Sequence, residues 1–152
     1  MDKKDIIIIL LSLIIIALLA NNYMEDNTIL YQTVNLTSTF SIDVPYSQSV
    51  TNTQLDEHLH LINDTQNDIQ IYCFNTGGTS ITDLLTEGTG FVTTREMYKL
   101  GAEQITLSNY TVYYNRKDNN YMAFFSNEHN DNVMIITHDN ETMARMIESV
   151  NY

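Results

Sequence analysis

Residues 58–74 read HLHLINDTQNDIQIYCF, and the fold depends on the pattern in this stretch. Apolar and polar residues alternate on both sides of the polar tetrapeptide at 64–67. Such alternation is typical of strands with one buried face, and a tetrapeptide rich in Asp and Asn is typical of a hairpin turn. We therefore predict an antiparallel hairpin of strands 58–63 and 68–74. Cys73 falls on the apolar side of the second strand and is predicted to be a core residue.

Further runs with strand character lie on both sides of this hairpin. Residues 29–36 and 39–44 precede it, and Pro45 ends the second run, so residues 46–53 are expected to form a loop. Downstream, strands are predicted at 104–107, 111–115, 121–126 and 133–137, the middle two being joined by a polar turn at 117–120.

Two helices are predicted in the middle of the chain. The tetrapeptides Ser-Ile-Thr-Asp at 80–83 and Thr-Thr-Arg-Glu at 93–96 have the pattern of capping boxes, which begin helices. Gly88 and Gly101 lie where glycines end helices in a left-handed conformation. The expectation is therefore two short helices.

A third helix is predicted at the C-terminal end. Met143, Met146, Ile147 and Val150 follow the i, i+3, i+4, i+7 spacing of one helix face, and Asp139 or Asn140 can cap the first turn. The order of elements is strands, helices, strands, helix. This order predicts an α+β fold in residues 25–152, an antiparallel β-sheet with helices packed on it.

Residues 1–24 differ in kind from the rest of the chain. Residues 6–20 are apolar on every face except for Ser12, which is typical of a membrane segment rather than of a helix half-buried in a core. At ~1.5 Å per residue the run covers about 22 Å of a ~30 Å hydrocarbon core, so flanking Lys3, Lys4 and Tyr23 would have to extend it. Residues 1–24 are predicted to be an N-terminal membrane anchor, a transmembrane helix through residues 6–20.

Cleavage of the same segment as a signal peptide is the alternative. The sequence fits a signal-peptidase cleavage site poorly, because cleavage after Ala20 would place the bulky Leu18 at the −3 position. Both readings export residues 25–152, since basic residues precede the segment and acidic residues follow it. The expected location is the cell membrane, with a single pass and the C-terminal domain outside, or secretion after cleavage.

The charge of the chain argues against nucleic acid as a partner. The net charge is −12, from 19 acidic and 7 basic residues. Phosphate backbones are bound by clustered Lys and Arg, and the exported part has only the basic residues Arg95, Lys99, Arg116, Lys117 and Arg145. No nucleic-acid partner is therefore expected, and anionic lipid headgroups are disfavoured for the same reason.

Few residues are candidates for chemistry. His58 and His60 would share a strand face about 7 Å apart and are the candidate metal ligands, although the local pattern supplies no third ligand. The oxygen-rich segments 128–132 and 138–141 are explained by a turn and a helix cap, and they lack the spacing of a calcium loop. No catalytic residue and no cofactor is predicted, because the chain has no G-x-S-x-G, H-E-x-x-H, phosphate-loop or dinucleotide motif.

Tyrosines mark the candidate surface for a partner. Tyr113, Tyr114 and Tyr121 lie on two strands that the polar turn joins, and exposed tyrosine is a common contact residue in interfaces. The alternative is cross-strand packing inside the protein.

Three stretches resemble a known group of proteins. TFSIDVP at 39–45, YKLGAEQIT at 98–106 and VMIITHDNETMARMIESV at 133–150 are similar to the Mog1/PsbP/DcrB-like α+β group, especially its small membrane-anchored prokaryotic members of unknown function. The resemblance covers about residues 31–150. It implies an α+β fold and an accessory or binding role, without shared catalytic residues.

The predicted function is that of a non-enzymatic, membrane-anchored extracytoplasmic module that binds a cell-envelope partner. A purely structural or accessory subunit of a membrane complex is a second prediction of the same kind. The alternative is a metal-binding or hydrolytic domain that uses His58, His60 and the acidic loops.

Overall fold

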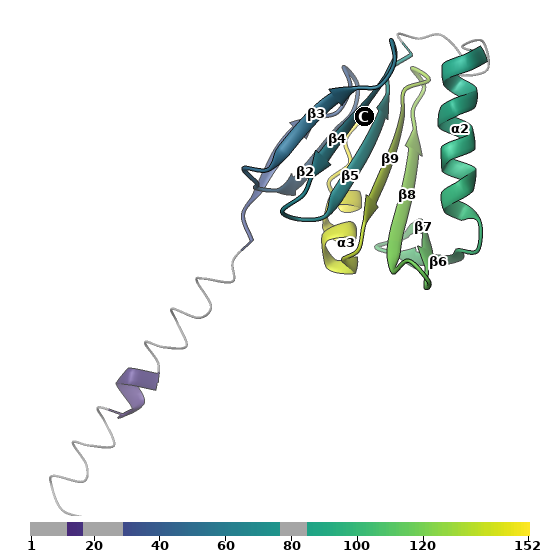
Figure 1. Ribbon diagram of the computed structural model, residues 1–152. Helices are drawn as coiled ribbons and strands as arrows, with labels where there is room; N and C mark the ends of the chain where they lie inside the picture. Colours follow the sequence, from purple (N-terminus) through teal and green to yellow (C-terminus); the bar gives the residue numbers. More distant parts are fainter. Residues whose placement is uncertain (1–11, 17–28, 77–84) are drawn as a thin grey trace, which may run out of the picture. The chain divides into compact units, whose positions relative to one another are not determined.

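The chain divides into two units, Met1–Leu30 and Tyr31–Tyr152. Antiparallel strand pairing organises the second unit. The computed structural model describes residues 12–16, 29–76 and 85–152 (Figure 1). In the first unit, residues 12–16 are helical and the apolar side chains of 13–16 are exposed. None of the helices in the described ranges is both long enough and apolar enough to span a membrane. The predicted anchor at 6–20 lies mostly outside those ranges.

The second unit is an α+β fold. Its elements are β1 Tyr31–Asn35, β2 Ser41–Pro45, β3 Val50–Gln54, β4 Leu59–Asp64, β5 Ile69–Phe74, α2 Leu85–Lys99, β6 Glu103–Leu107, β7 Tyr110–Asn115, β8 Asn120–Ser126, β9 Asn132–Thr137 and α3 Asn140–Glu148. Seven strands form one sheet in the order β3-β4-β5-β9-β8-β7-β6, and β1 and β2 form a separate two-stranded sheet. All of these pairs are antiparallel, so the predicted fold class is confirmed for this unit.

The hairpin predicted from residues 58–74 is confirmed as β4 and β5. Its register pairs His60 with Cys73 and closes with Asp64 opposite Ile69. Cys73 is fully buried, as predicted, and this burial raises the pKa of its thiol to about 12. A thiol in that state is almost entirely protonated at neutral pH, which is the inert condition of a structural cysteine.

Strand β9 joins this hairpin to the C-terminal strands. It pairs with β5 on one side and with β8 on the other, and each of its six residues is buried. Successive residues of a strand point to opposite faces. Ile135 therefore belongs to one core, whereas Met134 and Ile136 belong to another.

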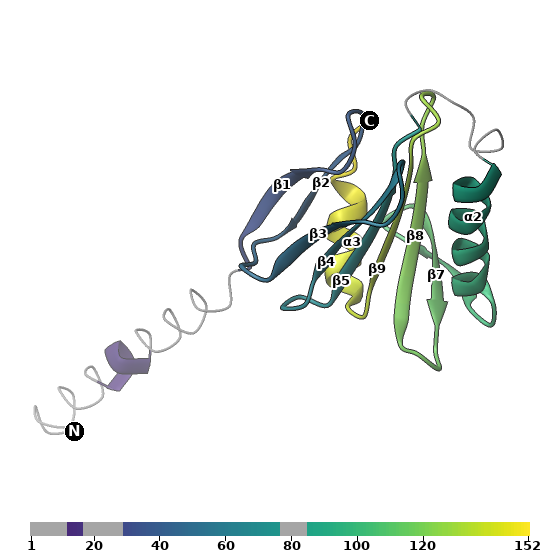
Figure 2. The ribbon, with the colours of Figure 1, turned by 45° about the horizontal axis from the view of Figure 1, so that its top comes forward.

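Each face of the sheet has its own cover. The α3-side core contains Ile71, Ile135 and the helix residues Met143, Met146 and Ile147, and it also receives Phe40 and Ile42 from the β1–β2 hairpin. Helix α3 contacts β2, β8 and β9 (Figure 2). The α2-side core contains Phe74, Phe91, Met122, Met134 and Ile136.

Helix α3 forms where the apolar spacing predicts it. Met143, Met146 and Ile147 have no exposed surface. Asp139 is the N-cap, and its carboxylate accepts the N–H of Thr142 at 2.7 Å. An acidic N-cap satisfies a free donor of the first turn and interacts favourably with the helix dipole.

A buried carboxylate fastens three loops together. Asp131, only 1% exposed, accepts hydrogen bonds from the hydroxyls of Thr37 and Thr39 at 2.8 and 2.6 Å. Its other oxygen accepts the N–H of Thr76 at 3.0 Å. The β1–β2 turn, the chain after β5 and the β8–β9 turn are thus tied to one residue.

The prediction of two short helices in the middle of the chain is wrong. One helix, α2, runs from Leu85 to Lys99 through the glycine at 88, and the capping box at 93–96 lies inside it. The hydroxyl of Thr94 donates to the carbonyl of Gly90 at 2.9 Å, a bond made within a continuing helix. Burial of Phe91 against the sheet stabilises the helix across these weak helix formers. The capping box at 80–83 lies outside the described residues.

The loop predicted at 46–53 is confirmed for residues 46–49 and wrong for 50–53, because β3 begins at Val50. Its sequence, Val-Thr-Asn-Thr-Gln, has no apolar alternation that would reveal a strand, and all five residues are exposed. Pairing with β4 forms this strand, from Val50 opposite Asp64 to Gln54 opposite His60. The prediction for Gly101 is confirmed. This residue lies between α2 and β6 and has φ +77°, the left-handed conformation expected after a helix.

The β4–β5 turn is held by Asp64, which is 4% exposed. Its carboxylate accepts the Ser47 hydroxyl at 2.6 Å, the N–H of Gln66 at 3.0 Å and the Asn67 side-chain amide at 2.7 Å. Burial by itself would raise the pKa of Asp64, but the hydrogen bonds outweigh it and leave this pKa below its ordinary value.

We expect Asp64→Asn to lower the free energy of unfolding by about 1–3 kcal/mol at pH 7, because the bonds to a charged acceptor are lost or weakened. A lowered folded-state pKa adds stability that is full above the unfolded value of 3.8 and is lost as pH falls through the folded value. In urea denaturation, the gap between wild type and variant should therefore close below pH 4. Glu57→Gln, at an exposed position, should change little at any pH, and a gap that is independent of pH would contradict the assignment.

Candidate functional site

Helix α2 is fixed on the sheet through its N-terminal half. Phe91 is 1% exposed, and its ring centroid lies 5.5 Å from that of Phe74 and 6.0 Å from that of Phe124. Three rings from α2, β5 and β8 thus pack in tilted geometry, which is favourable for aromatic pairs.

Two cations lie over aromatic rings further along the helix. The Arg95 guanidinium is 4.7 Å from the Phe124 ring centroid, and the Lys99 ammonium is 5.1 Å from that of Tyr113. Both also pair with Glu96, at 2.7 and 3.1 Å. The hydrogen bonds from Lys99 and Arg95 hold the pKa of Glu96 below its ordinary value.

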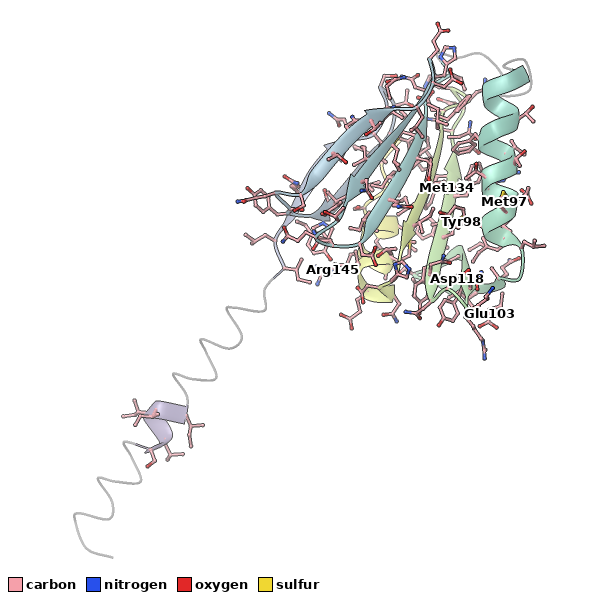
Figure 3. The ribbon with its side chains drawn as sticks, viewed as in Figure 1. Met97, Tyr98, Glu103, Asp118, Met134 and Arg145 are labelled. Atoms are coloured by element: carbon pink, nitrogen blue, oxygen red, sulfur yellow. The ribbon has the colours of Figure 1, made fainter. Side chains whose placement is uncertain are left out.

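A hollow of about 380 Å³ opens between this half of the helix and the sheet. We call it the α2 hollow; its described lining is Tyr72, Thr94, Met97, Tyr98, Asn115, Asp118 and Asn120. The residues come from β5, from α2 and from the β7–β8 hairpin. Figure 3 labels Met97 and Tyr98 on the helix and Asp118 near that hairpin.

The two tyrosines of the hollow interact. Tyr98 and Tyr72 are neighbours in its lining. Burial raises the pKa of the Tyr98 phenol, and the neighbouring Tyr72 raises it further. The Tyr98 hydroxyl therefore stays protonated at neutral pH and keeps the capacity to donate and to accept hydrogen bonds.

The lining is suited to recognition by hydrogen bonds. It offers hydroxyl and amide groups, a thioether and one carboxylate, and Asp118 accepts the Asn115 side-chain amide at 3.1 Å. The volume lies within the range of about 300–1,000 Å³ that small-molecule sites have. The hollow can thus receive a small neutral polar ligand or one side chain of a partner.

Exposed apolar side chains continue this surface. Met97 is 69% exposed and Leu100 is 80% exposed. Leu100 directly follows the last residue of α2, and its N–H still bonds to the carbonyl of Glu96 at 3.1 Å, so its side chain lies on the same side of the helix as that of Met97. Exposed methionine adapts to partners of different shape.

The tyrosines predicted to bind a partner do not form one surface. Tyr113 packs with the α2-side core, beneath Lys99. Tyr114 and Tyr121 belong to the opposite face, where their rings stack with centroids 4.6 Å apart and an angle of 22°. Burial and the nearby Tyr114 raise the pKa of Tyr121. Whether the stacked pair binds a partner stays a prediction.

The candidate metal ligands are in different surroundings. His58 precedes β4, and its ring lies 6.4 Å from that of Phe74, on the α2 side. His60 donates from Nε2 to the carbonyl oxygen of Leu36 at 3.0 Å, on the α3 side. Within residues 12–16, 29–76 and 85–152, no three His, Cys, Asp or Glu side chains are grouped so that they could hold a metal ion.

A second, more polar hollow of about 290 Å³ lies beside α3. Its lining is Tyr31, Asp43, Arg145, Glu148 and Ser149. Arg145 lies over the Tyr31 ring at 5.4 Å, and the Ser149 hydroxyl accepts the N–H of Asp43 at 2.8 Å. These contacts link α3 to the β1–β2 hairpin, so a structural role explains the residues that line this hollow.

Sequence reasoning missed the tyrosines of the α2 hollow. The one available signal was that Tyr72 alternates with Ile71 and Cys73, which places it on the face opposite theirs. Tyr98 follows the second capping box and is therefore expected in a helix, but the sequence does not pair it with Tyr72, because the length and position of α2 depend on its packing against the sheet.

Comparisons of this chain with models of protein families, with curated proteins and with solved structures find no match.

We expect Phe91→Ala to destabilise the protein by about 3–5 kcal/mol, because it leaves a cavity between α2 and the sheet. Met97→Ala, six residues further along the same helix, should change stability by less than about 0.5 kcal/mol, since this side chain is largely exposed. Thermal and chemical denaturation would measure both. Equal losses would show that Met97 packs in solution against something other than solvent.

Proposed function

We propose that this protein is a membrane-anchored, extracytoplasmic binding or accessory module for a cell-envelope partner, that it is not an enzyme, and that the α2 hollow is its binding site. The observation that carries the proposal is the hollow itself. It combines hydrogen-bonding groups held in place by α2 and the β7–β8 hairpin with the exposed Met97 at its edge.

Two features of the first unit support the anchor. Residues 6–20 are apolar apart from Ser12, and the described turn at 12–16 is helical with exposed apolar side chains. Basic residues precede the segment and acidic residues follow it, which favours export of the remainder.

The metal-binding alternative has less support. His58 and His60 contact different groups on different sides of the sheet, and the bond from His60 to Leu36 is an ordinary structural contact. The likeness to the Mog1/PsbP/DcrB-like group agrees with an accessory role and stays a prediction.

The anchor is tested by fractionation of cells that express the full chain. We expect the protein in the membrane fraction, resistant to carbonate extraction, and the C-terminal unit accessible to protease added outside intact cells or spheroplasts. Ile14→Lys with Ile15→Lys should release it or prevent export, because each Lys at the centre of a spanning helix costs about 2.5–3.5 kcal/mol. Leu30→Lys, outside the apolar run, is the matched control. Protection of the C-terminal unit from external protease would contradict the proposal, and loss of the N-terminal residues by intact mass would replace the anchor with a cleaved signal.

The binding site is tested by a photo-crosslinking residue placed at Met97 in the full chain. A specific adduct with an envelope component is expected, and Asn115→Ala with Asn120→Ala should reduce its yield about fivefold or more, since hydrogen bonds in the hollow are removed. The same probe at Tyr46, which is 53% exposed in the link between β2 and β3, is the control. Equal labelling from both positions would show that the α2 hollow has no special role.

A further inference from the structure

Strand β3 is an unpaired edge of the seven-stranded sheet. Among the described elements it pairs with β4 alone, and all five of its residues are exposed. Figure 1 shows it as the outer strand of the sheet, at the end remote from α2. Within the part of the chain that the structure describes, no strand bonds to the backbone on its outer side.

The ladder with β4 shows which backbone groups point outward. Leu55, next to β3, donates its N–H to the carbonyl of Leu59 at 2.9 Å. Bonded and non-bonded pairs alternate in an antiparallel ladder, so Thr53 and Thr51 also bond to β4. The N–H and C=O groups of Val50, Asn52 and Gln54 then face away from the sheet.

This edge lacks the features that usually prevent pairing. Edge strands are commonly guarded by charged side chains, proline or bulges, and Val-Thr-Asn-Thr-Gln has none of them. The opposite edge, β6, does carry such a guard. Glu103 there accepts two hydrogen bonds from the Arg116 guanidinium, at 2.9 and 3.2 Å.

The part of the sequence that contains β3 carries charge of one sign. No Lys or Arg occurs between Lys4 and Arg95, whereas the described carboxylates of this part are Asp43, Asp56, Glu57, Asp64 and Asp68. Asp56 and Glu57 follow β3 in the sequence, separated from it only by Leu55. A strand that lies along this edge is favoured electrostatically when it carries basic residues.

We propose that the outer edge of β3 binds an extended, Lys- or Arg-bearing segment of another protein, which adds a strand to the seven-stranded sheet. Main-chain bonds to Val50, Asn52 and Gln54 supply the affinity in this mode, and charge supplies the preference for a basic segment. A second copy of the chain is a poorer occupant, because it brings together two surfaces of the same charge. This surface is separate from the α2 hollow and does not depend on it.

The probe is a fluorescent, strand-length peptide of alternating Lys and Val, titrated by anisotropy against the full chain in non-ionic detergent. Two peptides serve as controls, one with the central Val N-methylated and one with Glu in place of Lys. N-methylation keeps the charge but removes a main-chain donor and hinders pairing, so we expect binding to weaken about tenfold. The Glu peptide should not bind measurably.

The variants compare the two edges. Asn52→Pro removes an outward N–H and should weaken binding of the Lys peptide about tenfold, whereas Thr106→Pro, at the corresponding outward position of β6, should leave it within about twofold. If Asn52→Pro unfolds the domain, Asn52→Lys tests the same edge by charge repulsion, with Thr106→Lys as its control.

Three results would overturn the proposal. Equal binding of the N-methylated peptide would show attraction by charge alone, and equal effects of the β3 and β6 variants would show that β3 is not the site. Concentration-dependent self-association that Asn52→Pro abolishes would identify a second copy as the occupant. None of these results bears on the crosslinking at Met97.

Discussion

The pairing of β9 between β5 and β8 is the constraint on which the rest of the structure depends. Every described long-range link within the sheet between the β3–β4–β5 part and the β8–β7–β6 part passes through this strand. Its residues are buried on both faces, so each face supplies one of the two cores. Its turn residue Asp131 also binds Thr37, Thr39 and Thr76, which ties the β1–β2 hairpin to the same place. Loss of β9 would therefore expose both cores at once.

The two faces of the sheet differ in how completely they are covered. On one face, α3 and the β1–β2 hairpin enclose Met143, Met146 and Ile147 entirely. On the other, α2 is held at Phe91, and its last turns leave a hollow beside Tyr72 and Tyr98. The basic side chains Arg95 and Lys99 rest on aromatic rings at this side, whereas the β3 end of the sheet has carboxylates without basic neighbours in the sequence. Two surfaces of different chemistry are thus separated by the width of the sheet.

The sequence predicted elements whose signal is local. The alternation in 58–74 reflects one buried face per strand, and the spacing of Met143, Met146 and Ile147 reflects one buried face of a helix. Predictions failed where tertiary contacts outweigh local preference. The sequence predicts that a helix ends at Gly88, but α2 continues through this residue because Phe91 is buried against the sheet. It predicts a loop where β3 lies, but these residues form a strand because β4 pairs with them. The candidate site was the least predictable part, because its lining is drawn from β5, α2 and the β7–β8 hairpin.

The sequence by itself determined the α+β class, the core position of Cys73, the C-terminal amphipathic helix and the acidic character of the chain, since each follows from periodicity or composition. Only the tertiary structure decided the strand order, the single helix α2, the separation of Tyr113 from Tyr114 and Tyr121, and the free edge of β3. The physical reason is that neighbours in a sheet are chosen by burial of surfaces far apart in the chain. A pattern within one segment shows which face it will bury, but not which segment will cover it.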